Sequence, residues 1–177
     1  MSHPSNLIFS ENNKIMSMAI MIALGVVLHR FEALLPLPSP WIKLGLANLM
    51  TLVALVYLGF KEAVIVTLLR VVLGSILGGT FLGPTFFLSM VGGMASILVM
   101  GVIYKKSKKY LSLVGVSILG AYAHTLATSA CVYFFLIREI SFFTLLPFFF
   151  SLALITGTLT GSIANSLTRQ MQQIRVS

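Results

Sequence analysis

The sequence contains no aspartate, and its four acidic residues lie far apart: Glu11, Glu32, Glu62 and Glu139. Paired-carboxylate hydrolysis, two-metal sites and the Asp-rich, magnesium-dependent sites of prenyl synthases all need clustered carboxylates. The chain also has no Gly-Lys-Ser/Thr sequence, so it does not bind ATP through a P-loop. These absences predict a protein with no catalytic residues, no metal site and no cofactor.

Cysteine and charge are scarce as well. Cys131 is the single cysteine, which excludes an intramolecular disulfide and a Cys-rich metal site. Charged residues make up 9% of the chain and apolar residues 58%, with a mean hydropathy of +1.01, whereas about 25% of a soluble domain is charged. The composition predicts an integral membrane protein without a separate soluble domain.

Six apolar segments are long enough to be membrane-spanning helices. They cover about residues 14–34, 42–60, 62–79, 84–104, 111–137 and 142–167. Pro36, Pro38 and Pro40 end the first, Gly59 separates the second from the third, and Gly78–Gly79 with Gly83–Pro84 precede the fourth. The third is the weakest candidate, at about 25 Å. We predict an all-α bundle over 14–168, with polar tails at 1–13 and 169–177.

The net charge of +8 is explained by topology rather than by nucleic-acid binding. With the N-terminus inside, eight Lys and Arg residues fall on the inner side and three, Arg30, Lys43 and Arg138, on the outer side. The positive-inside rule then places both termini in the cytoplasm. Lys14 comes too late for a cleavable signal peptide, so the first segment is retained. We expect a multi-pass protein of a bacterial plasma membrane.

Arg70 lies within the apolar run from Ala63 to Leu77, which holds no other charge. An arginine at membrane depth costs about 3 kcal/mol or more and normally faces protein, ligand or a water-filled cavity. Glu32, near the outer end of the first span, and a bound anion are the two candidates for its counter-charge. Arg70 is therefore the first residue predicted to bind substrate.

Other polar residues within the spans are weaker candidates for the same site. His124 is either a ligand contact, a proton carrier or a histidine that packs between helices. Asn48 is a better candidate than Asn165, and Ser89 adds a hydroxyl near the outer side. Five phenylalanines of the last span are interpreted as facing lipid, or else as a wall for an isoprenoid-like ligand: Phe142, Phe143, Phe148, Phe149 and Phe150.

Several spaced motifs resemble one family. They are KLGLANL (43–49), LGFKEA (58–63), LRVVLGS (69–75), SMVGGMAS (89–96) and GAYAH (120–124). Together they resemble the Gx transporter family, also labelled heptaprenyl diphosphate synthase component I, over about residues 15–165. That family is similar to the substrate-binding S components of energy-coupling factor (ECF) transporters, which have six helices and both termini inside.

The resemblance implies a partner interface and a ligand pocket. S components meet the transmembrane coupling subunit through an Ala-x-x-x-Ala pattern on the first helix, which Ala19 and Ala23 match. They bind a small solute near the outer side, beneath the loop between the first two helices, here the Pro-rich segment 36–40. On this basis the predicted substrate-binding residues are Arg70, His124, Asn48, Glu32, Lys43 and Ser89.

Three functions are consistent with these observations. The first is an ECF substrate-binding subunit that captures a small anionic or amphipathic metabolite, such as a vitamin or an isoprenoid or quinone precursor, and works with coupling and ATPase subunits. The second is a membrane scaffold for an isoprenoid diphosphate synthase. The third is a stand-alone proton-coupled carrier that uses His124 or Glu32.

Overall fold

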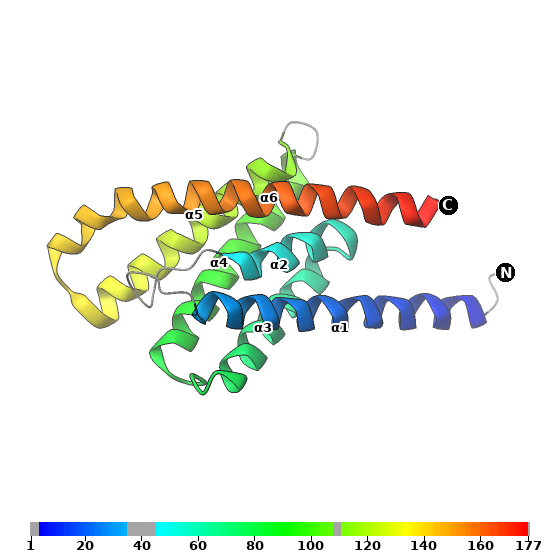
Figure 1. Cartoon of the computed structure of the whole chain (residues 1–177), viewed down its shortest axis with the longest axis horizontal. Helices are drawn as coiled ribbons and strands as arrows, with labels where there is room; N and C mark the ends of the chain where they lie inside the picture. Colours follow the sequence, from blue (N-terminus) through cyan, green and yellow to red (C-terminus); the bar gives the residue numbers. More distant parts are fainter. Residues whose placement is uncertain (1–3, 35–44, 108–110, 177) are drawn as a thin grey trace.

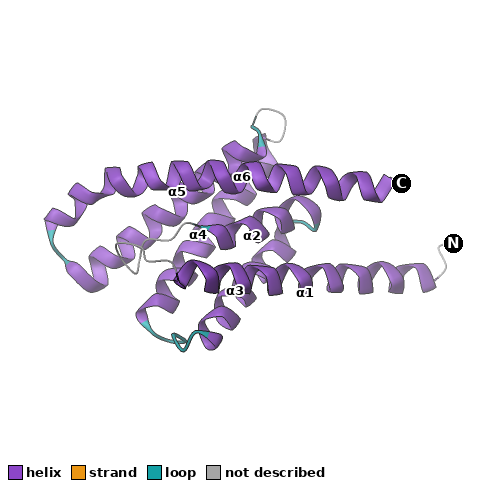
Figure 2. Ribbon diagram, in the orientation of Figure 1, coloured by secondary structure: helices purple, strands orange, loops and turns teal. Residues whose placement is uncertain are grey.

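The structure, a computed structural model, describes residues 4–34, 45–107 and 111–176, and over these ranges it is helical with no strand (Figure 2). The elements in chain order are α1 (Pro4–Leu34), α2 (Leu46–Tyr57), α3 (Phe60–Leu77), α4 (Pro84–Ser107), α5 (Leu113–Val132), a π-helix η1 (Tyr133–Ile137), a 3-10 helix η2 (Ile140–Leu145) and α6 (Leu146–Val176). The all-α prediction is confirmed. The parts of the expected tails that are described continue α1 and α6.

The helix breaks fall where the sequence predicts them. Gly59 has φ 115°, a conformation that side chains disfavour, and it separates α2 from α3. Pro84 begins α4, because proline is well suited to a first helical turn. The hydroxyl of Ser112 accepts a hydrogen bond from the amide of Gly115 at 3.3 Å and so caps α5.

Helix length shows which segments can cross a bilayer. Four segments are long and apolar enough to do so: Asn12–Glu32, Pro84–Lys106, Leu113–Phe135 and Phe142–Gln170. The chain is therefore a multi-pass membrane protein. The second segment, rather than the third, is the shortest, because α2 has 12 residues and extends about 18 Å, compared with about 30 Å of hydrocarbon.

A helix this short is tolerated because α2 lies at the centre of the bundle. It packs against α1, α3, α4 and α6, and every residue from Leu49 to Leu55 is buried. The middle of α2 is thus surrounded by protein rather than lipid, so this helix does not have to span the hydrocarbon by itself. The first turn of α1 and the last turn of α6 lie at the same end of the molecule (Figure 1). That this end is cytoplasmic stays a prediction from the charge count.

Small residues bring α5 and α6 together. A Cβ on Gly157 would lie 2.8 Å from the Cα of Ile118, and one on Gly161 would lie 2.7 Å from the Cα of Val114. Backbone therefore meets backbone along this pair, which is how helices gain contact area in lipid.

Four of the five phenylalanines around the start of α6 divide into two groups. Phe143 and Phe148 are about half exposed, as expected for lipid contact. Phe142 and Phe149 are instead buried in a core cluster with Leu88 and Val132. The interpretation of all five as lipid-facing is therefore wrong for these two, because α4 and α5 cover that face of the segment.

Candidate functional site

Arg70 lies on the buried face of α3, with 3% of its surface exposed. Its Nε donates to the hydroxyl of Thr51 at 3.2 Å, and its Nη2 donates to Oδ1 of Asn48 at 2.7 Å. Both partners are on α2, one turn apart, so the planar guanidinium holds two positions of that helix at once. Both are neutral, and the guanidinium charge is thus not cancelled by its hydrogen bonds.

Two glycines make room for this side chain. A Cβ on Gly25 of α1 would lie 3.2 Å from Cδ of Arg70, and one on Gly93 of α4 would lie 3.6 Å from its Nη2. Two helices, α1 and α4, therefore pack closely against the arginine, which is bound to α2. This close packing restricts the movement of the guanidinium.

The hydrogen bonds continue beyond Arg70 in two directions. Asn48 donates through Nδ2 to the hydroxyl of Ser96 on α4 at 3.3 Å. The hydroxyls of Thr51 and Thr67 lie 3.0 Å apart, and Thr67 also donates to the carbonyl of Ala63 at 2.8 Å. These bonds satisfy polar groups that lipid cannot solvate, and they tie α2, α3 and α4 together around the arginine.

A small cavity of about 10 Å³ lies beside Arg70, large enough for about one water molecule. Five helices, α1 to α5, contribute to its wall. The lining residues are His29, Glu32, Gly45, Asn48, Arg70, Ser89 and His124. We call it the charged compartment, because a glutamate, an arginine and two histidines line it.

Glu32 supplies the acid of the charged compartment. It is 4% exposed, and its Oε1 accepts a hydrogen bond from the amide of Gly45 at 2.5 Å, immediately before α2. The positive end of the α2 dipole lies at the same place. The same carboxylate lines the cavity together with the Arg70 guanidinium. The compartment therefore contains both signs of charge.

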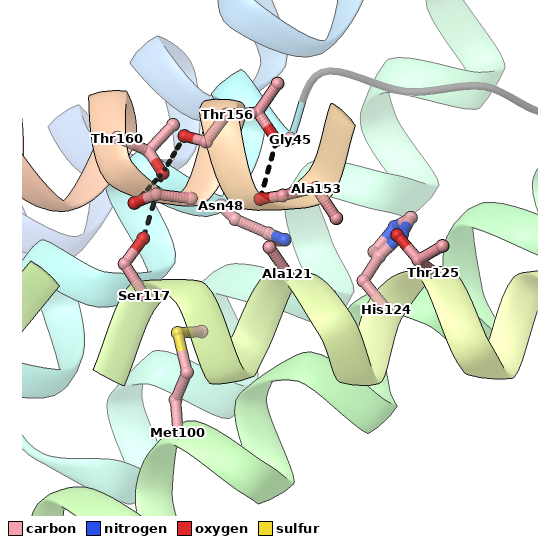
Figure 3. Close-up of a pocket in the computed structure, with 11 residues that line it drawn as sticks. Gly45, Asn48, Met100, Ser117, Ala121, His124, Thr125, Ala153, Thr156 and Thr160 are labelled. Carbon is pink, nitrogen blue, oxygen red and sulfur yellow. Dashed lines mark hydrogen bonds between the residues drawn. The ribbon is translucent and has the colours of Figure 1, made fainter. Parts of the chain in front are cut away.

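A second cavity of about 20 Å³ adjoins the first and shares Gly45, Asn48 and His124 with it. Its other walls come from α4, α5 and α6: Met100, Ser117, Ala121, Thr125, Ala153, Thr156, Gly157 and Thr160. Figure 3 shows Ser117 on α5 facing Thr160 on α6, with the Asn48 side chain projecting between these helices. We call it the hydroxyl compartment.

The structure thus brings together five of the six residues predicted to bind substrate: Glu32, Asn48, Arg70, Ser89 and His124. Lys43 and the Pro-rich segment 36–40 lie outside the described residues. That these side chains bind a ligand stays a prediction, as does the choice between Glu32 and an anion as the counter-charge of Arg70. Asn165 lines neither cavity.

Sequence reasoning missed several lining residues. His29 was passed over, although it precedes Glu32 by three positions and so shares a helix face with it. The hydroxyls at Thr156 and Thr160 have the same kind of signal, a four-residue spacing on α6. Ser117 has no such signal, because only the packing of α5 against α6 places it opposite Thr160.

Ala19 and Ala23, the predicted partner interface, lie away from both cavities. Both are exposed and occupy one face of α1, four residues apart. The exposed side chains around them, including Met16 and Ile20, are apolar. This face is available to lipid or to another membrane helix.

Comparison with known proteins agrees with this architecture. The S component of a bacterial ECF transporter superposes on the chain with a TM-score of 0.72 and 20% sequence identity, over 93% of this chain and 98% of that one. The bundle therefore has the S-component fold that the resemblance implies. No curated protein matches the chain. The family model for heptaprenyl diphosphate synthase component I matches residues 21–167, and the chain belongs to that family.

Proposed function

We propose that the protein is the substrate-binding subunit of an ECF-type importer in the cell membrane, where it captures a small anionic or amphipathic metabolite from the outer side. The observation that carries the proposal is the charged compartment: Arg70, Glu32 and two histidines converge on one cavity inside a membrane bundle. Convergent polar groups in an otherwise apolar setting are typical of a ligand site.

Arg70 is the residue on which binding depends most. Its guanidinium is fixed by Asn48 and Thr51, and arginine recognises a carboxylate or phosphate through two parallel hydrogen bonds. A bound anion would offset a charge that is costly at membrane depth. The cavities are large enough for only a few water molecules, so the helices around them must separate when a metabolite enters.

The exposed pair Ala19 and Ala23 supports the coupling part of the proposal. Two small residues four positions apart let a partner helix approach the α1 backbone closely. The chain has no ATP-binding P-loop of its own, so we infer separate coupling and ATPase subunits. On this view the chain is a transport subunit and not itself an enzyme.

Ligand capture tests the proposal directly. The purified protein in detergent is incubated with a water-soluble extract of bacterial cells, washed, and analysed by mass spectrometry for retained compounds. Wild type is expected to retain an anionic compound that Arg70→Ala loses, while Arg138→Ala, at an exposed turn, retains it. If wild type retained nothing beyond what Arg70→Ala retains, the binding function would be rejected.

Co-expression with ECF coupling and ATPase subunits tests the interface separately. Ala19→Trp with Ala23→Trp is expected to abolish co-purification, because the bulky rings hold a partner helix away. Ala130→Trp, at an exposed position on α5, serves as the matched control. Equal co-purification of the two variants would refute the α1 interface.

The family description favours one alternative, a membrane scaffold for an isoprenoid diphosphate synthase. That function predicts a stable complex with a soluble, Asp-rich synthase and no need for a filled cavity. Arg70→Ala would then leave the complex intact. A pull-down with the synthase from the same genome distinguishes the two functions.

A further inference from the structure

The hydroxyl compartment has a chemistry that restricts the ligand. We propose that it receives the uncharged part of the substrate, and that this part is compact and carries N–H or O–H donors rather than an isoprenoid or other alkyl tail. The inference rests on the proposed binding function and narrows its substrate to a polar acid. It also replaces the idea of a phenylalanine wall for an isoprenoid chain.

The location of the aromatic side chains argues against such a tail. Among the described residues, no phenylalanine, tyrosine or tryptophan lines either cavity. Phe142 and Phe149 are buried in a separate cluster with Leu88 and Val132, and Phe143 and Phe148 are exposed. The apolar side chains in the hydroxyl compartment are Met100, Ala121 and Ala153, too few to enclose a long chain.

Three of the four hydroxyls that line this compartment, those of Ser117, Thr156 and Thr160, donate their hydrogens within the protein. Thr156 donates to the carbonyl of Ala153 at 3.3 Å, and Thr160 donates to the carbonyl of Thr156 at 2.8 Å. A hydroxyl has one hydrogen, so Ser117, 2.9 Å from Thr160, supplies the hydrogen between them. All three oxygens keep lone pairs, and the compartment therefore offers acceptors to donors on a ligand.

Asn48 joins the two compartments. Its Oδ1 accepts from Arg70 and its Nδ2 donates to Ser96, while its side chain lines both cavities. A ligand whose acid reaches Arg70 would have its remaining part beside Asn48 and His124. If this remaining part extended further into the protein, it would reach the threonines of α6 and not the phenylalanines.

The matched variants are threonines of the same helix. Thr156→Val and Thr160→Val remove a hydroxyl from the compartment while keeping the shape of the side chain. Thr158→Val is the control, because Thr158 is exposed and its hydroxyl donates to the carbonyl of Leu154. Thermal unfolding in detergent establishes that each variant is folded, and Thr156→Val is the more conservative test because its hydrogen bond stays within α6.

Two probes are used with these proteins: the water-soluble cell extract, and farnesyl diphosphate, an anion with an isoprenoid tail. We expect wild type to retain an acidic compound that bears N–H or O–H donors. Thr156→Val and Thr160→Val should each reduce its retention about tenfold, the effect of a lost hydrogen bond in a buried polar site, and Thr158→Val should leave it unchanged. Farnesyl diphosphate should not displace it.

The remaining outcomes distinguish a failure of the polar-substrate inference from a failure of the proposed binding function. Binding of farnesyl diphosphate in an Arg70-dependent way would overturn the inference and keep the binding function. Retention that is insensitive to both Thr156→Val and Thr160→Val would also overturn it. If wild type and Arg70→Ala retained the same compounds, the binding function itself would fail.

Discussion

Two charged groups of α3 lie in opposite environments. At the start of the helix Glu62 pairs with Lys14 of α1, and these side chains are 17% and 46% exposed. Eight positions further along the same helix, Arg70 is 3% exposed and its guanidinium is bound by neutral groups. The Lys14–Glu62 pair links the surfaces of α1 and α3, whereas Arg70 links α3 to α2 in the interior of the bundle. Burial, more than charge itself, therefore distinguishes the candidate site.

Reversing the buried charge should have the largest effect. Arg70→Glu would place a second carboxylate beside Glu32 and leave Asn48 without its donor, so we expect a destabilisation of about 3 kcal/mol or more. Arg138→Glu makes the same change at an exposed turn. The midpoints of thermal unfolding in detergent are the measurement, and equal shifts for the two variants would show that the buried position is not special.

Removing a neutral partner of Arg70 should have an intermediate effect. Asn48→Ala deprives a buried guanidinium of its 2.7 Å acceptor, a loss of about 1–3 kcal/mol. Asn165→Ala, on α6 and away from both cavities, is the control and should change stability less. The same unfolding measurement applies, and a larger shift for Asn165→Ala would contradict the network described around α2.

Breaking the exposed pair should have the smallest effect. Glu62→Gln removes the charge that Lys14 faces, and because the pair is partly exposed we expect less than about 1 kcal/mol. Raising the salt concentration should reduce the difference between wild type and Glu62→Gln further, since salt screens exposed charges. A loss as large as that of Asn48→Ala would mean that the pair is a structural anchor of α1.

Much of the site could be predicted because burying polar groups in lipid is costly. Arg70, His124 and Asn48 are conspicuous as polar residues within apolar segments and Glu32 as the nearest plausible acid, and the family resemblance groups them into one pocket. His29 was not selected, because it lies at the end of an apolar segment, where polar residues need no explanation. The hydroxyls of α6 were missed for a different reason: threonine is common in membrane helices, where it bonds to its own backbone.

For the helices, too, some features could be predicted from the sequence and others could not. Their breaks follow from glycine and proline, whose backbone preferences are local. The short, enclosed α2 was not predicted, because its apolar sequence resembles that of a spanning segment. Only its contacts with α1, α3, α4 and α6 show that it is surrounded by protein.

The sequence by itself determined that this is a multi-pass helical membrane protein, where its helices break, and that Arg70 needs a partner. Composition, local backbone preference and the cost of an isolated charge are properties of the residues, whatever their neighbours. The tertiary structure alone decided which polar side chains meet: Ser117 with Thr160, and Asn48 between the two compartments. Helix adjacency arises from packing between distant segments, and a linear pattern does not contain it.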